Sequence, residues 1–143
     1  MDAQGESRYA VPKFRDLVKD IPFAMFTTVT ADGGLRSRPM VAAENAFDGM
    51  LWFFTRTSSA VAQEVAGNSM VNVTYVSAPE DRFVSVSGSA SVVRDVERAT
   101  GMWSPAYNQW FAGGASDPEL SLIRIDVTRI EFWDRKAGRM REL

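Results

Sequence analysis

Two arginines on one short extended segment are the residues whose spacing first indicates chemistry. Arg36 and Arg38 stand on either side of Ser37, and Pro39 and Met40 follow directly. Because alternate side chains of a β-strand share a face, the two guanidinium groups would point the same way. Such close cations repel unless anions pair with them, and a phosphate or an electron-rich ring carbonyl would serve. Two solvated edge arginines paired with nearby carboxylates would give the same pattern, so both interpretations stay open.

A second candidate site lies where an apolar run ends in hydroxyl and cationic side chains. Residues 52–59 read Trp-Phe-Phe-Thr-Arg-Thr-Ser-Ser, and Ser58 or Ser59 can cap a helix over about 60–66. The unpaired N–H groups and the dipole of a first helical turn favour an anion, and Arg56 could add positive charge. Ordinary capping of the helix by Ser58 would explain these residues equally well without any ligand.

Two aromatic segments are further candidates, and the first of them could form a wall against a flat ligand or a dimer contact. Trp103 and Trp110 fall in a stretch over 103–118 that reads as an ordered loop with short helical turns. The last apolar segment, residues 130–133, reads Ile-Glu-Phe-Trp and ends on Trp133. A loop held by its own aromatic side chains, and a final strand with core aromatics, are the plainer interpretations of the two segments.

The composition excludes several kinds of chemistry. The chain has no cysteine and no histidine, which excludes disulfides, thiolate metal sites, Ser-His triads and most zinc sites, and no metal site is predicted. Catalysis would need a carboxylate, a hydroxyl, Lys, Arg or a bound cofactor. A net charge of −2 argues against a dedicated nucleic-acid binder. The cations are 13 Arg and three Lys, and the Arg fork suits a small phosphorylated ligand.

The length and hydropathy of the chain predict one domain over residues 1–143, with a loose lead-in over 1–10. No apolar stretch of about 18 residues exists, so no membrane span is expected. The polar start, Met1 to Ser7, has no apolar signal core. We therefore expect a cytoplasmic protein that contacts neither membrane nor nucleic acid.

The pattern of apolar residues predicts a mainly β fold with about three short helices. Short antiparallel connections favour a small barrel over a parallel α/β sheet. Gly88, in the middle of a long strand, is expected to permit a bend or a bulge. Strands are predicted at 24–30, 35–43, 50–55, 70–76, 82–94, 120–127 and 130–133, a turn at 48–49, and helices at 12–19, 60–66 and 96–102.

The order of these segments resembles the pyridoxamine 5'-phosphate oxidase-like FMN-binding split barrels, and within them the general stress protein 26 group. The resemblance covers about 24–133. It implies a six-stranded antiparallel split barrel and a homodimer with two flavin sites between its subunits. The matching motifs are Arg38 to Met40, Trp52 to Thr55 followed by serine and a helix, Arg82 to Gly88, Trp110 to Pro118, and Ile130 to Trp133.

The same resemblance implies roles for individual residues. Arg38 falls on the arginine that approaches the flavin, Thr55 and Ser58 fall on the phosphate ligands, and Trp133 falls on a tryptophan that contacts the flavin of the other subunit. The cofactor-binding residues predicted in this way, together with their neighbours, are Arg36, Ser37, Arg38, Pro39, Met40, Phe54, Thr55, Arg56, Ser58, Ser59, Trp110 and Trp133.

The chain also departs from that family pattern. The family usually has a lysine just after the phosphate-binding serine, where this chain has Ser59 and Ala60. True pyridoxamine phosphate oxidases carry an Arg-x-His pair in the tail, whereas this chain has Arg139 and Arg141. Oxidation of pyridoxamine phosphate is therefore not expected. No residue indicates a dedicated acid or base, so any hydride chemistry would belong to the flavin.

These observations rank the functions that the sequence allows. The leading one is an FMN-binding protein of the general-stress type, which could act as an oxidoreductase with NAD(P)H or a small substrate. A non-enzymatic flavin carrier or redox sensor and a cofactor-free interaction module are alternatives. The deazaflavin F420 is the alternative cofactor, whereas haem ranks low because the usual axial histidine is absent.

Overall fold

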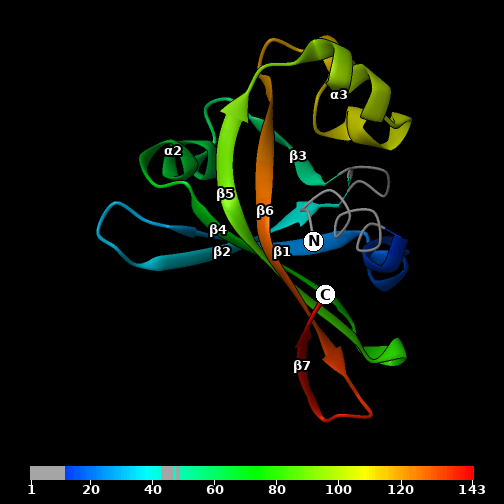
Figure 1. The fold of residues 1–143 in the computed structure, drawn as a ribbon. Helices are drawn as coiled ribbons and strands as arrows, with labels where there is room; N and C mark the ends of the chain where they lie inside the picture. Colours follow the sequence, from blue (N-terminus) through cyan, green and yellow to red (C-terminus); the bar gives the residue numbers. More distant parts are fainter. Residues whose placement is uncertain (1–11, 43–46, 48) are drawn as a thin grey trace.

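The computed structural model describes residues 12–42, 47 and 49–143, which form one curled sheet with helices at its margins (Figure 1). The predicted lead-in over 1–10, the predicted end of one strand at Ala43 and Asp48 of one predicted turn lie outside the described residues. Residues 12–18 are helical, close to the prediction. The following elements are β1 (Phe23–Val29), β2 (Leu35–Val41), β3 (Met50–Arg56), α2 (Ala60–Gly67), β4 (Met70–Ser77), η1 (Ala78–Glu80), β5 (Arg82–Val93), α3 (Val96–Met102), η2 (Pro105–Gln109), η3 (Gly114–Ser116), β6 (Leu120–Asp134) and β7 (Arg139–Glu142).

The strands form a single antiparallel sheet. Six of them lie in the order β2-β1-β4-β5-β6-β3, and β7 pairs with β6. The two ends of this order, β2 and β3, return to within 8 Å of each other between Cα atoms. The sheet therefore curls toward a barrel, which confirms the predicted mainly β split-barrel fold.

The longest strand, β6, replaces the two strands that the sequence predicts over 120–127 and 130–133. Its register against β5 shifts at one point: Ser87 lies opposite Arg129, but Gly88 lies opposite Val127. Thr128 is therefore an extra residue on β6, and its hydroxyl donates to the Ser87 carbonyl at 3.2 Å. This is a β-bulge at the glycine where the sequence predicts a bend or bulge.

The interior of the barrel is a continuous apolar core. Phe26 of β1 and Phe53 of β3 are almost fully buried, and their rings meet edge to face with centroids 5.4 Å apart. This contact links the strand that precedes β2 to the strand that precedes α2, so the core fixes the two elements that carry the candidate site. Other fully buried members are Phe14, Val73, Val84, Val86, Ile123 and Ile125.

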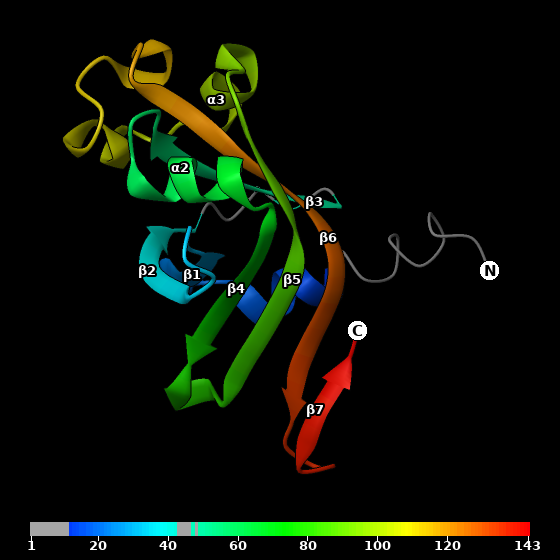
Figure 2. The ribbon, with the colours of Figure 1, turned by 90° about the vertical axis from the view of Figure 1, so that its left-hand side faces the viewer.

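Helices α2 and α3 lie against different parts of the sheet. Helix α2 buries Val61, Ala62 and Val65 and lies beside the β1–β2 hairpin, as Figure 2 shows. Both views place α3 where β5 ends and β6 begins, and β7 at the opposite end of β6. Within the described residues, no helix combines the length and the apolar character needed to cross a membrane.

Candidate functional site

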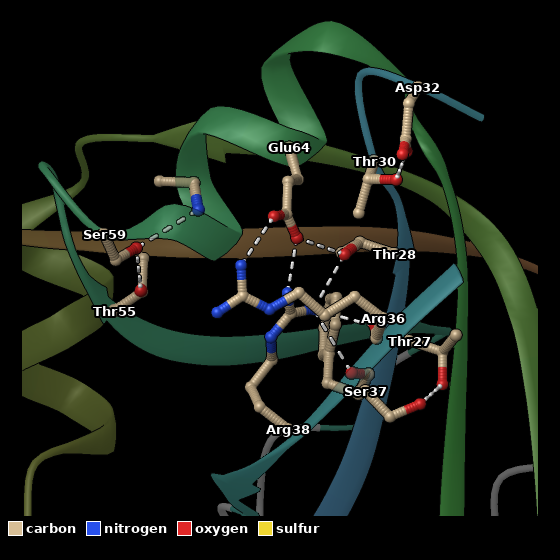
Figure 3. A network of polar contacts seen from close by, with 12 residues as sticks. Thr27, Thr28, Thr30, Asp32, Arg36, Ser37, Arg38, Thr55, Ser59 and Glu64 are labelled. Carbon is tan, nitrogen blue, oxygen red and sulfur yellow. Dashed lines mark hydrogen bonds and ion pairs between the residues drawn. The ribbon is translucent and has the colours of Figure 1, made fainter. Parts of the chain in front are cut away.

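The two arginines of β2 meet a carboxylate from α2. Arg36 and Arg38 share one face of the strand, as their spacing predicts, and Glu64 points onto that face from the helix (Figure 3). One Glu64 oxygen, Oε1, pairs with Nη2 of Arg38, and the other, Oε2, lies 3.3 Å from Nη1 of Arg36. The protein's own carboxylate thus supplies an anion for both cations.

Arg38 is held mainly by its neighbours on the sheet. Its Nη1 donates to the Thr28 hydroxyl at 2.8 Å and to the main-chain oxygens of Arg36 at 3.2 Å and Phe26 at 3.3 Å. The Arg38 side chain is 18% exposed, whereas that of Arg36 is 57% exposed. Arg36 is therefore the arginine that a ligand in solution would meet first.

Glu64 is a functional candidate that the sequence interpretation missed. Its carboxylate accepts a hydrogen bond from Thr28 at 2.6 Å as well as those from the two arginines. The Thr28 hydroxyl is the largest cause that lowers the pKa of Glu64 below its ordinary value of 4.5; burial opposes this effect, and Arg38 and Arg36 add to it. Glu64 is consequently an anion at neutral pH.

A cluster of hydroxyl groups lies at the start of α2. The hydroxyls of Thr55, at the end of β3, and Ser59 are 2.8 Å apart, and Ser59 accepts the main-chain N–H of Ala62 at 3.1 Å. Ser59 is therefore the residue that caps α2, while Ser58 is exposed. Figure 3 shows this cluster beside the start of α2 and the two arginines of β2 beside Glu64, further along the same helix.

Other predicted site residues of β2 face elsewhere or pack in the protein. The Ser37 hydroxyl lies 2.6 Å from that of Thr27, on the strand face opposite the arginines. Pro39 lies on that same face, opposite Met25 in the register, whereas Met40 packs against the main core. These three residues could adjoin a ligand mainly through their backbone.

Arg56 and the aromatic segment form a separate group. Arg56 donates to the Trp110 carbonyl at 2.5 Å and lies over the Phe111 ring at 5.3 Å. Phe54 packs against Trp103 at 5.3 Å between ring centroids. Arg56 thus anchors the η2–η3 segment to β3. A cleft of about 680 Å³ borders this segment and includes Trp110 in its lining.

Trp133 lies far from the hydroxyl cluster within one chain. Thr55 pairs with Ser121 near the start of β6, and Trp133 is twelve residues further along the same strand, next to Met140 of β7. At about 3.3 Å per residue this stretch of β6 is roughly 35 to 40 Å long. Trp133 cannot touch a ligand at Thr55 of its own chain.

Comparison with known proteins identifies the family. The family model described as "Pyridoxamine 5'-phosphate oxidase like" matches residues 9–143. The chain belongs to this family, which confirms the resemblance seen in the sequence. It is similar to protein bli-3 of Neurospora crassa, with 28% identity over 120 residues that cover 77% of this chain and 57% of that protein. The chain thus spans little more than half of this curated relative.

Solved structures of other proteins are also similar to this chain. A general stress FMN/FAD binding protein from Xanthomonas citri is 31% identical, with 85% of each chain covered and a TM-score of 0.71. The general stress protein 26 from Bacillus anthracis is 20% identical, covers 91% of this chain and 98% of its own, and has a TM-score of 0.73. The first likeness places the chain among general-stress-type relatives, and the second shows the shared fold.

Proposed function

We propose that this protein is a homodimeric FMN-binding protein of the general-stress type. The observation that carries the proposal is the approach of two groups to α2: the β2 arginines and the Thr55–Ser59 hydroxyl pair. A 31% identical relative is a general stress FMN/FAD binding protein, which supports a flavin as the ligand. FMN would supply hydride chemistry at its ring, and the chain would supply position and electrostatics.

The donors near α2 fit the phosphate of such a ligand. Thr55 and Ser59 offer hydroxyl groups, and Arg36 offers outward guanidinium N–H groups. No lysine follows the two serines, because Ala60 comes directly after Ser59 and Val61 comes next. We infer that Arg36 takes the place of the missing cation, and that Arg38 approaches the flavin ring beside the β2 backbone.

The tail gives no support to pyridoxamine phosphate oxidation. Arg141, which stands where a true oxidase has its histidine, donates to the Asp134 carboxylate at 2.8 Å. This contact is the largest cause that lowers the pKa of Asp134. The Arg141 guanidinium is thus already paired with a carboxylate of its own chain.

The flavin assignment is tested by titration. FMN added to the purified protein should lose its fluorescence with a dissociation constant in the low micromolar range. NADH and NADPH are then tested as reductants of the bound flavin, since reduction separates a reductase from a flavin carrier. No binding at hundreds of micromolar, with a folded protein, would contradict the proposal, and the same titration with F420 would then test the alternative cofactor.

An apolar row on the outer face of the sheet supports the proposed dimer. The register places Phe23 opposite Val41, Val76 opposite Phe83, and Trp133 opposite Met140. Continuing the β1–β4 ladder by two residues and the β5–β6 ladder by one brings these pairs into one row across β2, β1, β4, β5, β6 and β7. Phe23 is 54% exposed, and apolar residues so aligned are typical of a protein interface.

Phe23→Asp is expected to shift the protein from dimer to monomer, because it places a charge in that apolar row. Sedimentation velocity measures the change, and FMN affinity should fall with it, since Trp133 would come from the partner. Val96→Asp on α3 is the matched control, because Val96 is also an exposed apolar residue but lies off the sheet. A Phe23→Asp protein that sediments like the wild type would refute this interface.

A further inference from the structure

Arg36 and Glu64 both face one open cleft. The cleft, of about 720 Å³, lies between α2 and the β1–β2 turn, and its lining also includes Thr30, Ala60 and Gln63. A ligand anion that enters it meets the exposed Arg36 guanidinium and the Glu64 carboxylate together. The ion pair is therefore part of the wall that a ligand would contact.

Arg38 has hydrogen-bond partners on the sheet besides Glu64. Three oxygens of the sheet, from Phe26, Thr28 and Arg36, already accept hydrogen bonds from its Nη1. Two of these acceptors are main-chain carbonyls within the β1–β2 ladder, so they remain when a side chain of α2 changes. The main contribution of Glu64 to the surroundings of the two arginines is therefore its negative charge.

That charge has a defined consequence for a phosphate. Glu64 is anionic at neutral pH and occupies N–H donors of both Arg36 and Arg38. A phosphate oxygen that seeks the Arg36 donors must displace the carboxylate or remain beside it, and anions at such distances repel in a partly buried site. An uncharged flavin would feel neither effect.

We propose that Glu64 is a built-in competitor for the ligand's phosphate, and that it sets how strongly the site prefers a phosphorylated flavin to the unphosphorylated one. The inference rests on the proposed flavin function. It assigns a specificity-determining role to a residue of α2 that lies outside the strand carrying the arginines.

The test compares FMN with riboflavin, which has the same ring but lacks the phosphate. Glu64→Gln should raise the ratio of the riboflavin to the FMN dissociation constant about tenfold, through tighter FMN binding and unchanged riboflavin binding. Glu64→Ala should change the ratio in the same direction. Glu97→Gln on α3 removes the same charge from an exposed position and should leave the ratio unchanged.

The sign of the change decides between competition and positioning. If Glu64 instead oriented the arginines, both Glu64 variants would bind FMN more weakly, and that result, like an unchanged ratio, would overturn the inference. Melting curves of the variants verify that they are folded.

A second titration separates this inference from the flavin proposal. Inorganic phosphate, followed through the arginine Nε–Hε NMR signals, should bind more tightly to Glu64→Gln than to the wild type, whether or not a flavin binds. Equal or weaker phosphate binding by the variant would overturn the competitor role. Tighter phosphate binding together with no flavin binding would support the competitor role while refuting the flavin ligand.

Discussion

Arg38→Ala is expected to weaken FMN binding at least tenfold and to lower the free energy of unfolding by about 1–3 kcal/mol. The affinity falls because a charge-assisted contact to the flavin is removed. The stability falls because Thr28 and the partly buried Glu64 carboxylate both lose a donor. Fluorescence titration measures the first effect and urea denaturation measures the second.

Arg124→Ala is the matched control for this experiment. Arg124 lies on β6, is 41% exposed and pairs with Asp126 two residues away, so its removal changes the net charge equally but leaves the site intact. Both properties should stay close to the wild type, since exposed ion pairs contribute little. The dimer should persist in both variants. A folded Arg38→Ala protein with unchanged FMN affinity would reject Arg38 as a ligand.

Substitutions of Arg38 and of Glu64 are expected to change FMN affinity in opposite directions, although the two residues form one ion pair. Removing the cation should weaken FMN binding, whereas removing the anion should strengthen it. If the ion pair were purely structural, neither variant would bind FMN more tightly than the wild type does. The two variants together therefore distinguish a pair that supports the fold from one that regulates access of an anion to the arginines.

The arrangement of the arginines was predictable, but their partner was not. Side-chain alternation in a strand is a local property, so the spacing of Arg36 and Arg38 was sufficient to place them on one face. Glu64 follows Arg38 by 26 residues and reaches it only because β3 and α2 fold back over β2. The capping residue shows a smaller limit: Ser58 and Ser59 are both good caps, and only the backbone selects Ser59.

The break predicted within the last strand has a physical explanation. Ile125 and Ile130 are both buried, although an odd spacing would place them on opposite faces of a regular strand. The alternation therefore loses phase between them, which in the sequence resembles the end of one strand and the start of another. Thr128, the extra residue of the bulge, restores the phase within a continuous β6. A bulge and a strand break give the same pattern, and only the register distinguishes them.

Gly88→Val is expected to destabilise the fold by about 3 kcal/mol, because overpacking at this bulge has no room to relax. A Cβ atom at Gly88 would lie 2.5 Å from the main-chain oxygen of Asp126 and 2.7 Å from Cγ2 of Ile125. Urea denaturation measures the loss, and Ser89→Val is the control, because Ser89 is exposed on the same strand and a β-branched residue suits it. A Gly88→Val protein within 0.5 kcal/mol of the wild type would show that β5 and β6 can separate at the bulge. The positions of Ser121 and Thr55 would then not depend on the close approach of Gly88 to Asp126.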